Sequence, residues 1–186
     1  MRVLASIRNA DFSFENSPVR VIANRSCPEI RLAGLTIGPF EEGNDYEISY
    51  WIASELVRLG IAHYRSEDLL DAARLSKIQW TERVQTSGQM SKLPEGFYPK
   101  LRRYLSEIRE GMANSPEKMR EYERADHLSR DVVNSRLKKI VSLASAPAQT
   151  EGSLRNLTAE ERFFYDRLFK IINIWKSQIL NGKGGR

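Results

Sequence analysis

The chain has 186 residues, 41% of them hydrophobic and 28% charged, a composition typical of a folded protein with one domain or two small ones. No apolar run approaches the roughly 20 residues of a membrane-spanning helix, and the polar start of the chain lacks the apolar segment of a signal peptide, so a cytosolic protein is expected. The net charge of +5 comes from the second part of the chain, because residues 1–65 carry seven basic and eight acidic side chains.

The first 65 residues predict a small β-rich domain with one helix. Short apolar runs punctuated by proline and glycine are typical of strands, and here they occupy residues 19–23, 30–37, 46–50 and 61–65. Between the last two runs, Ser49 is placed to cap a short helix that has Ile52, Leu56 and Leu59 on one face. Gly60 ends this helix, because glycine readily adopts the left-handed conformation.

After residue 65 the spacing of apolar residues changes to the helical period and keeps it, which predicts an all-α domain. The fold class expected for the chain is therefore α+β. A small β-rich domain over residues 1–65 precedes a larger helical domain over residues 66–186.

The helical domain is expected to start with a helix over residues 66–84, capped by Ser66. Its inward positions are Leu70, Ala73 and Ile78. A loop over residues 86–96 follows, and the next helix has its apolar stripe at Phe97, Leu101, Leu105, Ile108 and Met112.

Two further helices complete the domain. Ser115 as cap and Pro116 at the first helical position start a long helix. Its apolar face consists of Tyr122, Ala125, Val132 or Val133, Leu137, Ile140 and Ala144.

A loop over residues 145–156 leads to the last helix, where Thr158 and Glu161 form a capping box. The stripe behind this box is Phe164, Leu168, Ile171, Trp175 and Ile179. Because the last two stripes are rich in aromatic residues, contact with another subunit is an expected use of them.

The glycines of residues 34–43 raise the alternative of a phosphate-binding loop. Such a loop needs GxGxxG, or GxxxxGK followed by Ser or Thr, and this stretch has neither. Acidic side chains would also repel a phosphate here: Glu41, Glu42, Asp45 and Glu47. A chain turn is therefore favoured over a nucleotide site.

No residue pattern indicates an enzyme. His63 falls in an expected strand and His127 in an expected helix, where a lone histidine is more often structural than catalytic. The single cysteine, Cys27, cannot form an internal disulfide, and no cluster has the spacing of metal ligands. We expect no catalytic residue, no cofactor and no metal.

Basic side chains on two of the helices are the remaining chemical lead. The candidates for contact with a nucleic acid or a partner are Arg102, Arg103, Arg124, Arg136, Lys138 and Lys139. Acidic residues interrupt them at helical spacing, which favours a solvated face or an inter-subunit network over a dedicated DNA-binding surface. A stand-alone, basic, helical DNA-binding protein is kept as the alternative function.

The sequence also resembles a known family. The "IGPFEEG" turn and the following "YWIASEL" helix are similar to the small β-rich B domain of the GINS family of DNA-replication proteins. The stretches "LPEGFYPKLRRYLSEIRE", "EYERADHLSRDVVNSRLKKIVSLAS" and "LTAEERFFYDRLFKIINIW" are similar to the helices of the family's A domain. The β-rich domain comes first, as in the Psf-two and Psf-three type subunits and their archaeal counterpart, and the archaeal form is favoured.

This resemblance implies a non-catalytic assembly subunit without a cofactor. GINS subunits form a tetramer, in archaea two copies each of two subunit types. The tetramer binds and activates the MCM replicative helicase together with a RecJ-like homologue at the replication fork. The implied location is the cytoplasm in an archaeon or the nucleus in a eukaryote.

Core and subunit contacts are assigned on this basis to Phe97, Leu101, Tyr122, Phe163, Phe164, Ile171 and Trp175. The turn Ile37, Gly38, Pro39 and Phe40 is expected to order the B domain against its neighbours.

Overall fold

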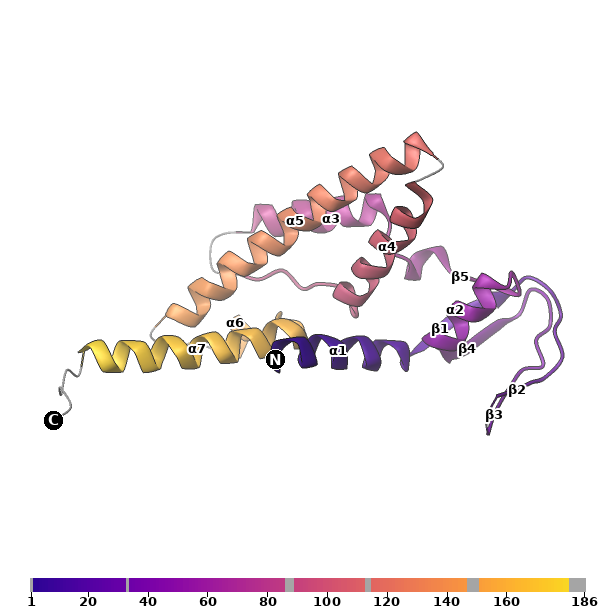
Figure 1. The fold of residues 1–186 in the computed structure, drawn as a ribbon, viewed down its shortest axis with the longest axis horizontal. Helices are drawn as coiled ribbons and strands as arrows, with labels where there is room; N and C mark the ends of the chain where they lie inside the picture. Colours follow the sequence, from indigo (N-terminus) through magenta and orange to yellow (C-terminus); the bar gives the residue numbers. More distant parts are fainter. Residues whose placement is uncertain (1, 33, 86–88, 113–114, 147–150, 181–186) are drawn as a thin grey trace. The chain divides into compact units, whose positions relative to one another are not determined.

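The computed structural model of the chain describes residues 2–32, 34–85, 89–112, 115–146 and 151–180 (Figure 1). The chain divides into two compact units, one formed by residues 11–69 and the other by residues 1–10 together with 70–186. The first unit holds the β-strands and the second is helical, which confirms the expected α+β class. The domain boundary after residue 65 stays a prediction, because compactness alone does not define an independently folding domain.

The smaller unit is built around β1 (Pro18–Ala23), the central strand of a three-stranded antiparallel sheet. β4 (Asp45–Ser49) pairs with one edge of β1, and β5 (Ala62–Tyr64) pairs with the other. Alternate residues of a strand point to opposite faces, so Val21 and Ala23 of β1 both turn into the core. The three runs that predicted these strands are confirmed.

The helix of this unit, α2 (Tyr50–Arg58), covers the core with Ile52 and Leu56. Gly60 follows it with a φ of 69°, in the left-handed conformation expected of a helix terminator. Leu59, expected on the same face, is exposed, because it lies beyond the last helical residue and no longer follows the helical period.

The remaining run forms a separate hairpin in place of one strand. β2 (Ile30–Leu32) and β3 (Leu35–Ile37) pair with each other, and Gly34 turns the chain between them with a φ of 92°. Only glycine adopts such a φ without strain, which is why the run breaks at this position.

The predicted turn after β3 belongs to the core of the same unit. Ile37 and Phe40 are buried, and the peptide bond between Gly38 and Pro39 is cis. Phe40 exchanges two backbone hydrogen bonds with Cys27, each with an N to O distance of 2.8 Å. The turn is therefore fixed by its own unit, and its contact with other subunits stays a prediction.

The other elements of the chain are all helical. They are α1 (Arg2–Glu15), the 3-10 turn η1 (Ser66–Asp68), α3 (Ala72–Val84), α4 (Phe97–Gly111), α5 (Pro116–Ser145), α6 (Glu151–Leu154) and α7 (Ala159–Leu180). Sequence analysis assigned no element to the residues of α1. The expected loop before the last helix contains the short helix α6, and residues 147–150 of that loop lie outside the described residues.

The helix expected over residues 66–84 begins later than predicted. η1 occupies its first turn, and α3 starts after Asp71, whose Oδ1 accepts a hydrogen bond from the backbone N–H of Arg74 at 2.7 Å. Leu70 therefore lies outside the helix, and the inward side is that of Leu75, which is fully buried, whereas Ala73, about 200° away around the helix, faces solvent.

The predicted starts of α5 and α7 are confirmed. Ser115 Oγ accepts a hydrogen bond from the backbone N–H of Lys118 at 3.4 Å, and Pro116 holds the first helical position. The capping box of α7 closes in both directions. Thr158 N donates to Glu161 Oε2 at 3.0 Å, and Glu161 N donates to Thr158 Oγ1 at 3.3 Å.

α5 is the central helix of this unit, since α3, α4 and α7 all pack on it. One core cluster consists of Leu75, Leu93, Phe97, Leu101, Tyr104, Ile108, Ala125 and Val132. A second consists of Met90, Ile140, Leu143, Ala144 and Tyr165. Of the two alternatives on α5, Val132 is the buried one and Val133 is exposed.

Candidate functional site

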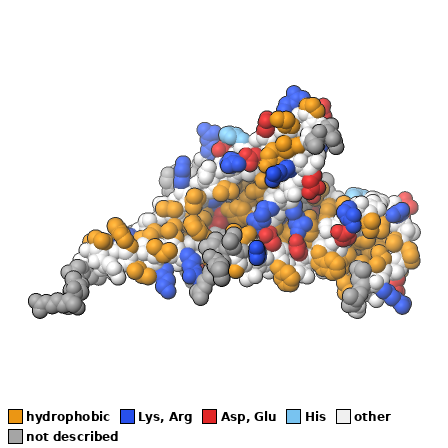
Figure 2. Space-filling view, in the orientation of Figure 1, with side chains coloured by type: hydrophobic (Ala, Val, Ile, Leu, Met, Phe, Trp, Pro, Cys, Tyr) orange, Lys and Arg blue, Asp and Glu red, His pale blue; other side chains and the backbone are white. Residues whose placement is uncertain are grey.

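The candidate site is an apolar face on α5 and α7. The first turns of α7 pack inward through Tyr165 and Leu168, but large apolar side chains further along the helix remain uncovered. Those more than half exposed are Ile171, Ile174, Trp175, Ile179 and Leu180. Figure 2 shows orange side chains along this part of α7, whose last turns extend past the end of α5 in Figure 1. Large uncovered apolar patches mark sites of contact with other molecules.

α5 adds a second uncovered stripe. Val133, Leu137 and Val141 follow one another at intervals of four residues and are each about two-fifths exposed. Residues at this spacing lie on one side of a helix, here beside the buried stripe that holds Val132 and Ile140. We define the α5–α7 face as Val133, Leu137 and Val141 of α5 with the α7 residues that the helical period places on one side, Phe163, Phe164, Ile171, Ile174 and Trp175.

A hollow of about 280 Å³ lies within this face. Its apolar walls are Ile7, Val133, Leu137, Ile140, Phe163 and Phe164. Its charged and polar lining comes from Tyr98, Arg102, Arg136, Glu160 and Glu161. A hollow of this size and lining is suited to receive one bulky apolar side chain of a partner.

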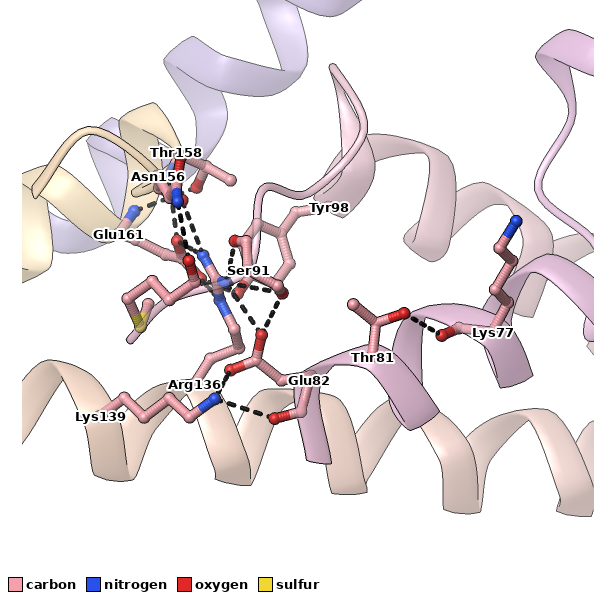
Figure 3. A network of polar contacts seen from close by, with 11 residues as sticks. Lys77, Thr81, Glu82, Ser91, Tyr98, Arg136, Lys139, Asn156, Thr158 and Glu161 are labelled. Carbon is pink, nitrogen blue, oxygen red and sulfur yellow. Dashed lines mark hydrogen bonds and ion pairs between the residues drawn. The ribbon is translucent and has the colours of Figure 1, made fainter. Parts of the chain in front are cut away.

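Buried charges beside this hollow form what we call the Arg136 network (Figure 3). The guanidinium of Arg136, with a side chain only 1% exposed, donates from Nε and Nη2 to the two carboxylate oxygens of Glu161 at 2.7 and 2.5 Å. Nη1 donates to the carbonyl of Ser91 at 2.7 Å and to Glu82 Oε2 at 3.2 Å. Nη2 also donates to the carbonyl of Asn156 at 3.0 Å. All five N–H groups of the side chain therefore have acceptors.

Glu161 joins this network to the capping box. Its side chain accepts hydrogen bonds from Arg136, from the backbone N–H of Thr158, and from the hydroxyl of Tyr98 at 2.6 Å. Burial and the charge of Glu161 raise the pKa of Tyr98 far above its ordinary value, so this hydroxyl keeps its proton and remains a donor.

Glu82 carries the second negative charge of the network. Lys139 Nζ lies 2.7 Å from Glu82 Oε1 and donates to the carbonyl of Glu82 at 2.8 Å, while the hydroxyl of Ser91 donates to Oε2. Burial opposes the charge of Glu82, but hydrogen bonds from Lys139 and Ser91 and the charge of Arg136 outweigh it and lower the pKa. Two cations balance two carboxylates, so the buried network is neutral as a whole.

The predicted core and contact residues fall into three groups. Phe97 and Leu101 are buried in the first core cluster, with Tyr122 packed against it half-buried. Phe163 and Phe164 are half-buried in the wall of the hollow. Ile171 and Trp175 are 64% and 62% exposed. The last two groups both lie on the α5–α7 face, and their contact with a subunit stays a prediction.

The six basic candidates do not form one surface. Arg136 and Lys139 are buried in the network, where carboxylates and carbonyls already accept their hydrogen bonds, so neither is available to a phosphate in this structure. Arg102 lines the hollow. Arg102, Arg124 and Lys138 are exposed and Arg103 is half-buried.

The described residues hold no group of three or more His, Cys, Asp or Glu side chains that could bind a metal ion. His63 Nδ1 lies 2.5 Å from Asn24 Oδ1, and His127 Nε2 lies 3.7 Å from Asp131 Oδ2. Both histidines are exposed. No described helix has the length and apolar character needed to cross a bilayer.

The sequence did not predict this network, because charged residues such as Arg136 and Lys139 were assigned to the solvent-exposed side of their helix. A signal was present, since Arg136 lies four residues from Val132 and from Ile140 and so shares their buried stripe. Glu82 likewise lies seven residues, about two helical turns, from Leu75. A charge in the middle of an apolar stripe at both positions indicates a buried ion pair.

The fold and site define a class of protein with a small β-rich unit and a helical unit that leaves an apolar face uncovered. Comparison with known proteins agrees with this class. A family model described as the GINS complex protein helical bundle domain matches residues 69–180, and the PSF2 N-terminal domain model matches residues 6–63. The chain is 28% identical to the human DNA replication complex GINS protein PSF2 over 157 residues, which cover 81% of this chain and 79% of the human protein.

The chain therefore belongs to the GINS family, as the resemblance of its motifs indicated. It is a non-catalytic subunit of a DNA-replication complex.

Proposed function

We propose that the α5–α7 face binds a second GINS subunit type and that the two types assemble as a 2:2 heterotetramer. The observation that supports this most is the uncovered apolar side of α7, where Ile171 and Trp175 are 64% and 62% exposed. Burying such side chains against a partner removes apolar area from water, which is the main driving force of stable association.

The hollow beside Phe163 and Phe164 supports the same proposal. Interface energy concentrates where a bulky side chain enters a well-packed pocket and excludes water. A hollow of about 280 Å³ with largely apolar walls offers such a pocket. In this proposal Phe97, Leu101 and Tyr122 act from within the fold, by holding α4 and α5 together beneath the contact surface.

The role further proposed for the tetramer is to bind and activate the MCM replicative helicase, together with a RecJ-like homologue, at the replication fork. The β-rich unit is proposed to dock on a neighbour through the turn from Ile37 to Phe40. Sheets and helix α2 fix this turn within the unit, so a partner would meet a preformed shape. The site of action is the archaeal cytoplasm, or the nucleus in a eukaryote.

The test is assembly with the second GINS subunit of the same organism, followed by light scattering and titration calorimetry. Trp175→Ala is expected to weaken binding by about 30-fold, the effect of losing one hot-spot aromatic side chain. Its thermal unfolding should stay near that of the wild type, because the side chain is 62% exposed in the free chain.

Trp80→Ala is a matched control, since Trp80 is 64% exposed but lies on α3, outside the α5–α7 face. Equal weakening by both substitutions would reject the location of the interface. A wild-type chain that stays monomeric beside the second subunit would reject the subunit role itself.

A stand-alone DNA-binding role has less support. Two of its six cations, Arg136 and Lys139, are held in the buried network. Affinity for a fluorescent DNA duplex that falls steeply with salt would favour this alternative, whereas an apolar subunit interface responds little to salt.

A further inference from the structure

The first turns of α7 form one wall of the hollow. Phe163 and Phe164, which form part of its wall, follow Glu161 by two and three residues. A helix rises 1.5 Å and turns 100° per residue, so a change in the residue at which α7 starts would redirect both rings. Whatever fixes the start of α7 therefore also fixes the wall.

Glu161 fixes this start from two sides. As a capping-box residue, it accepts from the backbone N–H of Thr158 at 3.0 Å, which ties it to the preceding turn. As an ion-pair partner, it accepts two hydrogen bonds from the guanidinium of Arg136 on α5. The cap is local to α7, whereas the ion pair joins α7 to the centre of the unit.

Arg136 extends that connection to the rest of the helical unit. It reaches Glu82 on α3, the carbonyl of Ser91 in the segment before α4, and the carbonyl of Asn156 just before α7. Only the planar fork of arginine can donate in all of these directions, because lysine carries its donors on a single atom. Tyr98 adds α4 to the same group through Glu161.

We infer that Arg136 is a positioning residue: through Glu161 it holds the start of α7 against α5, so that Phe163 and Phe164 form the partner-binding hollow before any partner arrives. This inference rests on the proposed function, since it concerns the same face. It adds that the face is preformed in the free chain and that one buried arginine preforms it.

The first measurement is hydrogen exchange of the full chain without a partner. Glu161→Gln isolates the ion pair, because glutamine also serves as the third residue of a capping box. We expect exchange over residues 159–170 to accelerate about tenfold or more, with residues 101–108 of α4, beyond the turn that holds Tyr98, unchanged. Arg136→Lys should give the same local pattern, since it keeps the charge and loses the fork.

Arg162→Lys is the matched control for Arg136→Lys. Arg162 lies on α7 and pairs with Asp166 at 3.3 Å, but both side chains are at least half exposed. This control should leave exchange over residues 159–170 within about twofold of the wild type, because exposed pairs contribute little.

The second measurement is affinity for the second GINS subunit, where Glu161→Gln and Arg136→Lys are each expected to bind about tenfold more weakly. Equal acceleration over residues 101–108 of α4 and over residues 159–170 would show that Arg136 stabilises the whole unit and not the start of α7 in particular, which would overturn the inference. No acceleration over residues 159–170, or acceleration with unchanged affinity, would overturn it as well. If the wild type does not bind that subunit, the proposed function fails, while the exchange pattern still decides whether Arg136 holds α7.

Discussion

Replacing Arg136 by methionine tests how much the buried network contributes to folding. The side chain is 1% exposed, and methionine fills the space of its stem without its charge. The two carboxylates respond differently. Glu82 keeps Lys139 at 2.7 Å, whereas Glu161, 4% exposed, is left without a cation among the described residues.

The expected loss in the free energy of unfolding is about 3–5 kcal/mol, the cost of leaving one partner of a buried ion pair uncompensated. Most of it should come from Glu161. Adding Glu161→Gln to Arg136→Met removes the stranded charge and keeps the capping box, so the double variant should recover about 1–2 kcal/mol relative to Arg136→Met alone.

The assay is urea unfolding followed by far-ultraviolet circular dichroism for the wild type, both single variants and the double variant. Arg162→Met, at an exposed ion pair, serves as the control and should cost less than about 1 kcal/mol. A loss below about 1 kcal/mol for Arg136→Met would refute the reasoning. A double variant whose loss equals the sum of the two single losses would refute the coupling.

Three further outcomes are expected. The pKa of Glu82 is lowered in the folded chain, so its contribution to stability is complete above the ordinary pKa of 4.5 and is lost in more acid solution. Glu82→Gln should therefore make the free energy of unfolding fall less steeply below pH 4.5 than it does in the wild type. Burial and the Glu121 carboxylate raise the pKa of Tyr104 to about 12. Tyr104 therefore stabilises the fold fully below the unfolded pKa of about 10, and this stabilisation is lost as the pH rises toward 12. An absorbance titration in which the phenolate of Tyr104 forms near pH 10 would contradict this prediction. Phe40→Ala removes a ring that is 2% exposed and should destabilise the β-rich unit by about 3 kcal/mol or more. Hydrogen exchange of the β1 amides measures this loss, and a change in their protection of less than about 1 kcal/mol would argue against the prediction.

The sequence predicted the elements whose signals are local. Alternating residues such as Val21 and Ala23 need only a strand to turn inward, and the starts of the long helices need only a capping residue within four positions. The start of α3 was misplaced because Ser66 and Asp71 are both acceptable caps, and only the packing of Leu75 decides between them.

The candidate site could be predicted only in part. The apolar stripe of α7 was visible, but the sequence does not reveal which of its residues a chain covers by itself. Tyr165 is buried in the second core cluster, whereas Trp175 is 62% exposed. The network depends on residues 25 and 54 positions apart in the chain, which pair only once the helices are packed. The sequence alone therefore predicts Arg136 as a surface cation, and only the packing of the helices shows that it is buried.

The exposure of the aromatic residues has a practical consequence for spectroscopy. All three tryptophans, Trp51, Trp80 and Trp175, are between 41% and 64% exposed. Their emission in the free chain should already resemble that of an indole in water, so unfolding would shift it little. Once a partner covers Trp175, that one fluorophore should move to shorter wavelengths, which makes the unlabelled chain its own optical reporter of assembly.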